Sequence, residues 1–127
     1  MIEIVLPMSR IWICASMSKI IRADHLTALF VSDGSPDYRA AETNRSGVLW
    51  ANVFGRTEPV RIDEFTGITA AELLDAVTKA IGQADPDEPV TYIRLDRAGD
   101  HNAATRVKTY NSYPLTDGSQ VDDQEGA

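Results

Sequence analysis

One amphipathic helix among many strand-like segments is the feature that most constrains this sequence. The apolar side chains of a single helical face recur between positions 70 and 81, as Leu73, Leu74, Val77 and Ile81. Thr69 and Glu72 have the spacing of a capping box, in which each side chain accepts a hydrogen bond from the other residue's backbone amide. A chain with one helix and several strands must use the helix to cover a sheet face, and this predicts the α+β class.

The segments before the helix are rich in β-branched and aromatic residues, which favour strands. They span residues 10–15, 19–32, 38–43, 48–54 and 60–65. Turn-forming residues separate them, for example the sequence DGSP at 33–36. Short turns join antiparallel neighbours, so we predict an antiparallel β-meander of about five strands with the helix packed on it. This core covers residues 10–84.

The region after the helix predicts a hairpin and then a polar end. Residues 90–96 and 105–110 have strand-like patterns on either side of a loop, so we expect a C-terminal β-hairpin within residues 90–110. Residues 116–127 contain four acidic residues and no Lys or Arg, which predicts a disordered acidic tail. A single α+β domain is therefore expected to span residues 1–115.

Charge and cysteine content limit the classes of partner. The net charge is −7, and it is −3 without the four acids of residues 116–127. Binding to the nucleic-acid backbone requires a basic face, so we expect no DNA or RNA partner. The lone Cys14 forms no internal disulfide and fits a cytoplasmic location. No apolar run approaches the ~20 residues that span a bilayer, and the first residues lack the pattern of a secretory signal, so no membrane partner is expected.

Motifs of catalysis are missing from the sequence. It contains no Gly-x-Ser-x-Gly elbow, His-Glu-x-x-His zinc motif, Walker A loop or Gly-x-Gly-x-x-Gly fingerprint. Asp24 and His25 are neighbours, but adjacent strand residues point to opposite faces and do not obviously cooperate. Cys14 lies in an apolar segment, where a thiol is typically a packing residue. We therefore expect a non-enzymatic protein that needs no cofactor.

A metal site is one alternative to this view. Asp96, Asp100 and His101 lie within the sequence LDRAGDHN, at a spacing that can hold a divalent cation through oxygen and nitrogen ligands. Such a site would suit a metal-dependent hydrolase. Asp, Gly and Asn are also the usual residues of turns, so the same segment predicts a loop without a metal.

A small basic patch is the second alternative. If the two strands of the C-terminal hairpin pair, Arg94 lies near Arg106 or Lys108, with Tyr92 and Tyr110 close by. Such a patch can bind a nucleotide or another anionic ligand through charge and stacking. Lys and Arg on an edge hairpin also discourage edge-to-edge association, which explains the same residues without a ligand.

Association with a protein partner, or with a second copy of the chain, is the function that the sequence favours. Residues 26–32 carry apolar side chains on both strand faces, and one helix leaves one sheet face needing cover. We therefore predict a small non-enzymatic protein that acts through protein–protein contact, as a homo-oligomer. Its candidate interface residues are Leu29, Val31 and Trp50.

Four pieces of the segment 10–84 form a recognisable pattern: the initial strand RIWI, the stretch IRADHLTAL, the hairpin strand GVLWANVF and the capped helix TAAELLDAV. In this pattern the segment resembles short uncharacterised α+β proteins of bacteria and their phages. The resemblance implies an α+β fold and no particular activity. The abundance of Ala, Asp and Arg further suggests a high-GC organism or its phage.

Overall fold

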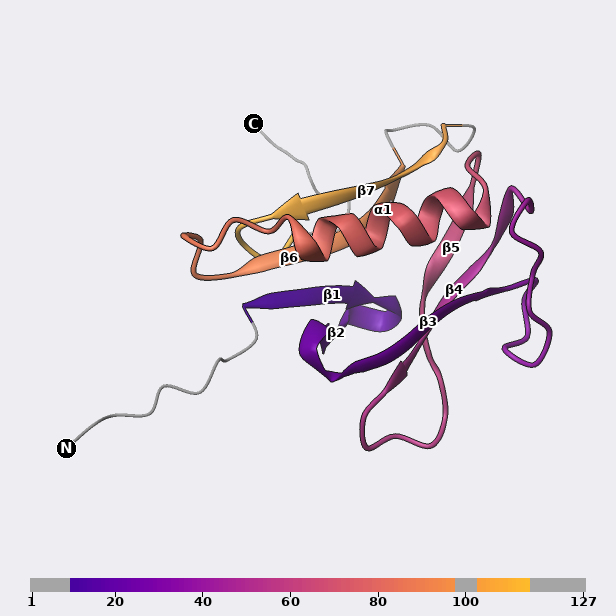
Figure 1. Ribbon diagram of the computed structural model, residues 1–127, viewed down its shortest axis with the longest axis horizontal. Coiled ribbons are helices and arrows are strands. Elements are labelled where there is room, and N and C mark those ends of the chain that lie inside the picture. The colour runs from indigo at the N-terminus through magenta and orange to yellow at the C-terminus, as the bar shows by residue number, and fades with distance from the viewer. Residues whose placement is uncertain (1–9, 98–102, 115–127) are drawn as a thin grey trace.

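The computed structural model describes residues 10–97 and 103–114, and these form one α-helix and seven strands (Figure 1). The strands are β1 (Ile11–Ala15), β2 (Lys19–Arg22), β3 (Leu26–Ser32), β4 (Ser46–Val53), β5 (Val60–Thr66), β6 (Thr91–Arg97) and β7 (Thr105–Tyr110). The helix α1 spans Ala70–Gly82. The predicted acidic tail lies outside the described residues, as do Asp100 and His101. Among the residues described, no helix is long and apolar enough to cross a membrane.

The strands form two sheets, and the α+β class is confirmed. Sheet A has the order β2-β1-β6-β7, and sheet B has the order β3-β4-β5. All neighbours are antiparallel except β1 and β6, which run parallel. The strand arrangement therefore differs from a single five-stranded meander, because β1 and β2 join the C-terminal hairpin instead of continuing into β3. A parallel pair needs a long crossover, and sheet B together with α1 supplies it.

The predicted strand at residues 38–43 is wrong. This segment makes one isolated bridge, between Arg39 and Ser32, and the rest is turn or irregular structure. Tyr38 is exposed, and Ala40 packs against the hydrophobic core. The segment instead lies along the edge of β3, where the Ala40 amide donates to the Val31 carbonyl at 2.9 Å.

The two sheets and the helix share one hydrophobic core. Sheet A contributes Ile13, Ile21, Ile93 and Leu95, sheet B contributes Val31, Leu49, Ala51, Val60, Ile62 and Phe65, and α1 contributes Ala70, Leu73 and Val77. In Figure 1, α1 lies along sheet A beside β7 and in front of β6, with sheet B at one end. One face of sheet A is therefore buried against α1 and sheet B, and the opposite face, here called the outer face, points away from the core.

The predicted capping box starts the helix as expected. The Thr69 hydroxyl accepts a hydrogen bond from the Glu72 amide at 3.1 Å, and the Glu72 carboxylate accepts one from the Thr69 amide at 2.9 Å. The hydrogen bond from the Thr69 backbone is the main reason that the pKa of Glu72 is lowered. This cap fixes where α1 begins and therefore how its apolar face meets β7.

Candidate functional site

All five residues of the predicted basic patch lie on the outer face of sheet A. Side chains alternate along a strand, so the burial of Ile93 and Leu95 in the core directs the other set of β6 residues outward. That set is Tyr92, Arg94 and Asp96. In the register of β6 and β7 these residues pair with Tyr110, Lys108 and Arg106, respectively. The hairpin thus presents a compact polar surface.

An aromatic row lies next to this basic patch. Trp12 of β1 pairs with Tyr92 of β6, and Tyr92 pairs with Tyr110 of β7, so the three rings share one face on neighbouring strands. Arg22 pairs with Trp12 from the other side. Trp12 did not emerge from the sequence as part of this site, because its place depends on the parallel pairing of β1 with β6. The alternation of Trp12 and Cys14 with Ile11 and Ile13 was the available local signal.

Asp96 organises the charged part of the site. Its carboxylate accepts a hydrogen bond from the Tyr110 hydroxyl at 2.6 Å and another from the Arg94 guanidinium at 3.1 Å. The Arg94–Asp96 ion pair is mostly sheltered, with side-chain exposures of 20% and 24%. The Arg94 guanidinium also lies 5.6 Å from the centre of the Tyr110 ring. These contacts hold Arg94 in place and neutralise it.

The protonation of these three groups follows from burial and from their mutual contacts. Burial raises the pKa of Tyr110, and the hydrogen bond to Asp96 and its charge raise it further, to about 12. Burial alone would raise the pKa of Asp96, but hydrogen bonds from Tyr110 and Arg94 outweigh it and lower that pKa. Burial alone would lower the pKa of Arg94, but Asp96 more than offsets this and raises it. At neutral pH the set is therefore a phenol, a carboxylate and a guanidinium.

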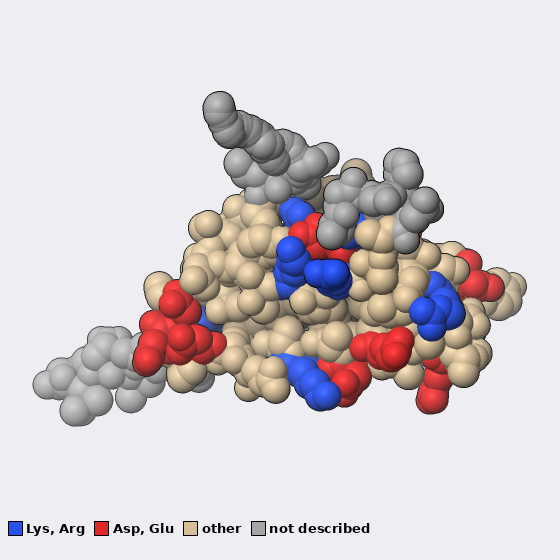
Figure 2. Space-filling view, turned by 90° about the horizontal axis from the view of Figure 1, so that it is seen from above, with Lys and Arg blue, Asp and Glu red and all other residues tan. Residues whose placement is uncertain are grey.

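Arg106 and Lys108 are the cations of the patch that no ion pair holds in the described part of the chain. Both side chains are exposed, and neither forms an ion pair with any other described residue. Lys108 is directly opposite Arg94, and the Asp96 carboxylate, whose pKa Lys108 helps to lower, offsets the repulsion between the two cations. Figure 2 shows basic side chains gathered beside acidic ones near the middle of the face seen from above.

A cavity of about 700 Å³ adjoins the basic patch at the ends of β1 and β6, and Asp63 of β5 also lines it. It is bordered by the β1–β2 turn, by Arg94, Asp96 and Arg97, and by Tyr113 and Pro114 of the C-terminal segment. The rings of Tyr113 and Tyr92 meet edge to face at 5.7 Å, and Pro114 is buried. The chain after β7 therefore returns over the outer face. Arg97 is close to Arg94 in sequence, but neither its place nor that of Tyr113 at this cavity can be predicted without the tertiary structure.

Cys14 also lines the cavity, but its chemistry is that of a packing residue. The thiol is buried, and burial raises its pKa against the smaller opposing effect of Arg94. A protonated thiol is a poor nucleophile and a poor metal ligand. This agrees with the role expected for it from the sequence.

The metal alternative finds no described site. Among residues 10–97 and 103–114, no group of three or more His, Cys, Asp and Glu side chains is placed to hold a metal ion. Asp96 is committed to Arg94 and Tyr110, while Asp100 and His101 fall in the segment that is not described. Elsewhere, Asp24 pairs with Arg22 at 3.1 Å.

The candidate interface residues on sheet B are largely used within the chain. Val31 belongs to the hydrophobic core and Leu29 packs against it, on the side covered by α1. Trp50 lies on the opposite face, where its indole N–H donates to the Ser32 hydroxyl at 2.7 Å. On that face, Arg39 stacks on the Phe30 ring at 3.8 Å. The second half of β3 is thus covered on both faces from inside the chain, by the core under α1 and by the segment that contains Arg39, whereas Thr27 and Ala28 are exposed.

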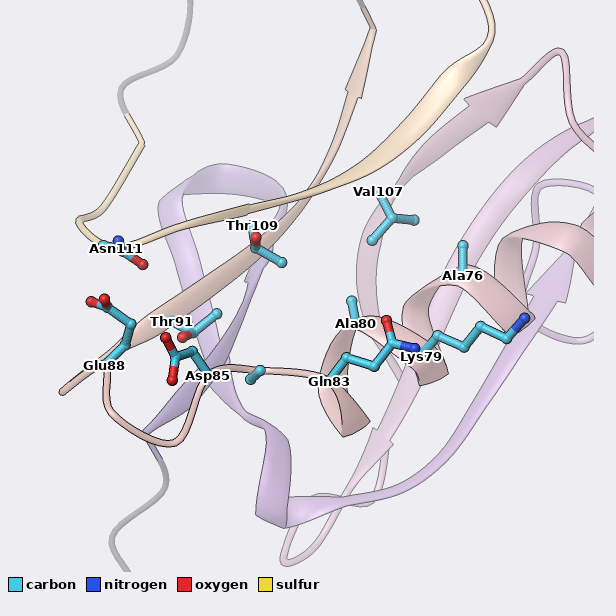
Figure 3. A pocket seen from close by; sticks show the side chains of 11 residues that line it. Ala76, Lys79, Ala80, Gln83, Asp85, Glu88, Thr91, Val107, Thr109 and Asn111 are labelled. Carbon is cyan, nitrogen blue, oxygen red and sulfur yellow. The ribbon is translucent and has the colours of Figure 1, made fainter.

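A second hollow of about 420 Å³ lies between the end of α1 and β7 (Figure 3). Its walls carry mostly small side chains, from Ala76, Ala80, Ala84, Val107 and Thr109. Asp85 and Glu88 lie at one end and Lys79 at the other, as Figure 3 shows. Lys79 is paired with Asp75 at 3.0 Å. The hollow therefore offers no free cation, and the basic patch is the better place for an anion.

Comparisons with protein-family models, with curated proteins and with solved structures found no match to this chain. The outer face of sheet A is therefore the basis for assigning a function.

Proposed function

We propose that this chain is a small non-enzymatic binding protein whose basic patch takes an anionic ligand of the nucleotide class. The observation that carries the proposal is the exposure of Arg106 and Lys108, without acidic partners among the described residues, beside the row Trp12, Tyr92 and Tyr110. Cations suit a phosphate, and an aromatic surface suits a base. The two requirements meet on one sheet face.

Each part of the site has a distinct role in this proposal. Arg106 and Lys108 donate charge-assisted hydrogen bonds to phosphate oxygens, while Tyr92 and Tyr110 offer ring surface to the base. Asp96 neutralises Arg94 and fixes its position, so Arg94 shapes the floor of the site and adds little net charge. No step of bond making or breaking is assigned to these residues. We place the protein in the cytoplasm, because its one cysteine is a thiol and nucleotides are abundant there.

Thermal unfolding with three chosen ligands tests this proposal. ATP carries both phosphate and base, inorganic pyrophosphate carries only phosphate, and adenosine carries only the base. A ligand at ten times its Kd stabilises the folded chain by about 1.4 kcal/mol and raises Tm by several degrees. We expect ATP to raise Tm most, pyrophosphate less and adenosine least at equal concentrations. If none of the three changes Tm at millimolar concentration, the proposal is wrong.

Native mass spectrometry of the protein purified from its own host provides an independent test. It reports bound small molecules and subunit number in one spectrum. We expect an added mass that matches a phosphorylated metabolite and that is lost in the variant Arg106→Glu/Lys108→Glu. A bound mass that persists in this variant would assign the ligand to another part of the chain.

Self-association is a second candidate function, favoured by apolar side chains that the fold leaves uncovered. Phe54 is 75% exposed and Met17 is 88% exposed. Both lie at turns, Phe54 after β4 and Met17 between β1 and β2. The proposed contact therefore excludes Leu29 and Val31, because Val31 belongs to the hydrophobic core and Leu29 packs against that core.

Sedimentation velocity tests this second candidate. We expect wild-type chain to sediment as an oligomer at about 100 µM and Phe54→Asp to shift it toward monomer, because a buried carboxylate opposes an apolar contact. Tyr38→Asp is the matched control, since Tyr38 is another exposed aromatic residue, 72% accessible, on a different turn. Monomeric wild-type protein at that concentration would rule the candidate out.

A further inference from the structure

The C-terminal segment leaves the described part of the chain directly at the basic patch. Tyr113 packs edge to face on Tyr92, and Pro114 is buried and lines the cavity that Arg94 and Arg97 also line. Whatever follows Pro114 therefore starts beside the cationic side chains of the hairpin. The covalent link to Pro114 keeps the following residues near these cations.

The chemistry of the following residues is complementary to that surface. Residues 116–127 contain Asp117, Asp122, Asp123 and Glu125, and no Lys or Arg. The surface that they would meet contains Arg94, Arg97, Arg106 and Lys108, with Asp63 and Asp96 as the acidic side chains near the cavity. The surface therefore has more basic than acidic side chains, and every charged side chain of residues 116–127 is acidic.

We propose that residues 116–127, the acidic C-terminal segment, dock on the basic patch of their own chain and compete with its anionic ligand. The docking stands on the charge and connectivity described above, whereas the competition rests on the proposed function. The segment thus acts as an internal stand-in for phosphate, which Asp and Glu carboxylates resemble as acceptors for Arg and Lys.

The length of the segment and its attachment make this docking feasible and weak. Twelve extended residues reach about 40 Å, far more than the distance between neighbouring strands of about 5 Å. Attachment to Pro114 gives the carboxylates a local concentration on the order of millimolar. Ion pairs at an exposed surface are individually weak and are screened by salt. The segment therefore lowers the apparent affinity for a ligand without closing the site.

Nuclear magnetic resonance of the ligand-free protein tests the docking alone. The full chain is compared with a chain that ends at Leu115, and with a full-length chain carrying Asp117→Asn, Asp122→Asn, Asp123→Asn and Glu125→Gln. We expect the amide signals of Arg94, Arg106 and Lys108 to move on truncation and on neutralisation alike, while that of Thr78 on α1 stays in place. The differences should vanish near 1 M salt, where the screening length is about 3 Å.

Two results of this experiment would overturn the proposal. Unchanged patch signals after truncation would show that the segment lies elsewhere. Differences that fade on dilution would assign the docked segment to a second copy of the chain, because binding within one chain does not depend on concentration.

Titration calorimetry with ATP tests the competition. A segment docked for two-thirds to nine-tenths of the time weakens ligand binding about threefold to tenfold. We expect truncation and neutralisation each to tighten ATP binding by that factor at low salt. Equal affinities in all three chains would overturn the competition. If no chain binds ATP while the patch signals still move on truncation, the docking holds and the proposed ligand function fails, so the two ideas fail separately.

Discussion

Asp96 determines which cations of the outer face are available to a ligand. By accepting hydrogen bonds from both Tyr110 and Arg94, it fixes one phenol and cancels one positive charge. Arg106 is its partner in the strand register but makes no ion pair with it within 4 Å. The carboxylate therefore serves as a positioning group, and the cations left available on the outer face are Arg106 and Lys108.

Replacing Asp96 with Asn should change how Tyr110 titrates. The pKa of Tyr110 is about 12 in the folded protein, and it should fall in Asp96→Asn but stay above 10.0, because burial still opposes the phenolate. Ultraviolet absorbance of tyrosinate during an alkaline titration measures this. The control Tyr110→Phe should remove the most alkaline step from the wild-type curve. If all wild-type tyrosines titrate together near pH 10, the Asp96–Tyr110 contact is not formed.

The same contact predicts the direction of an effect of pH on stability. The pKa of Tyr110 is higher in the folded chain than the ordinary value of 10.0. Its contribution is therefore fully present below pH 10 and is lost as the pH rises toward 12. Urea unfolding between these two pH values should show a smaller decline in the free energy of unfolding for Tyr110→Phe than for wild type. An equal decline would contradict the assignment.

At the scale of elements, the cap of α1 is the clearest test of how sequence fixes structure. Thr69→Ala removes the hydroxyl that accepts from the Glu72 amide, and loss of such a cap costs about 1 kcal/mol. Thr78→Ala is the matched control, because the Thr78 hydroxyl only bonds back to the Leu74 carbonyl on the exposed side of the helix. Urea unfolding should show the loss for Thr69→Ala and little change for Thr78→Ala. Equal effects would mean that the cap adds nothing.

The turn between β5 and α1 depends on close packing against the start of β7. Gly67 has φ of +84°, and a Cβ atom there would lie 2.6 Å from the Ala104 Cα atom. Gly67→Ala must therefore strain the backbone and displace β7, and we expect it to lower the free energy of unfolding by about 2 kcal/mol or more. Gly82→Ala is the control, since nothing lies within 4 Å of its Cβ position and the helix gains from Ala. A fully stable Gly67→Ala variant would contradict this packing.

At the scale of the whole molecule, local sequence patterns predicted the helix and most of the strands, but they did not predict which distant strands pair. The capping box at Thr69 and the strand at residues 105–110 follow from neighbours in sequence, and both were confirmed. The parallel pairing of Trp12 with Tyr92 joins positions far apart in the chain, and neither segment encodes it. The segment 38–43 failed for a related reason, because strand-like composition does not supply a partner strand.

The features of the candidate site also fall into two groups, those that neighbouring residues predict and those that depend on tertiary structure. Pairing of the two hairpin strands brought Arg94 next to Lys108, as the sequence suggested. The commitment of Asp96 to Arg94, the place of Trp12 and the return of Tyr113 over the sheet depend on tertiary structure. An interface was expected at Val31 because a single helix can cover only one face of a single sheet. In the structure, the core under α1 covers Val31, and the segment that contains Arg39 covers the opposite face of that part of β3.

Calorimetric titration of ATP into charge-reversed variants tests the central claim most directly. Arg106→Glu/Lys108→Glu reverses the two exposed cations of the basic patch, and Arg56→Glu/Lys79→Glu reverses two exposed cations elsewhere, one in the turn after β4 and one on α1. Each charge-assisted hydrogen bond contributes about 1.5–3 kcal/mol, so the first variant should bind ATP at least about tenfold more weakly than wild type. The second should bind within about twofold of wild type, because its charges lie outside the patch. Equal weakening in both variants, or none in the first, would contradict a ligand site on the outer face of sheet A.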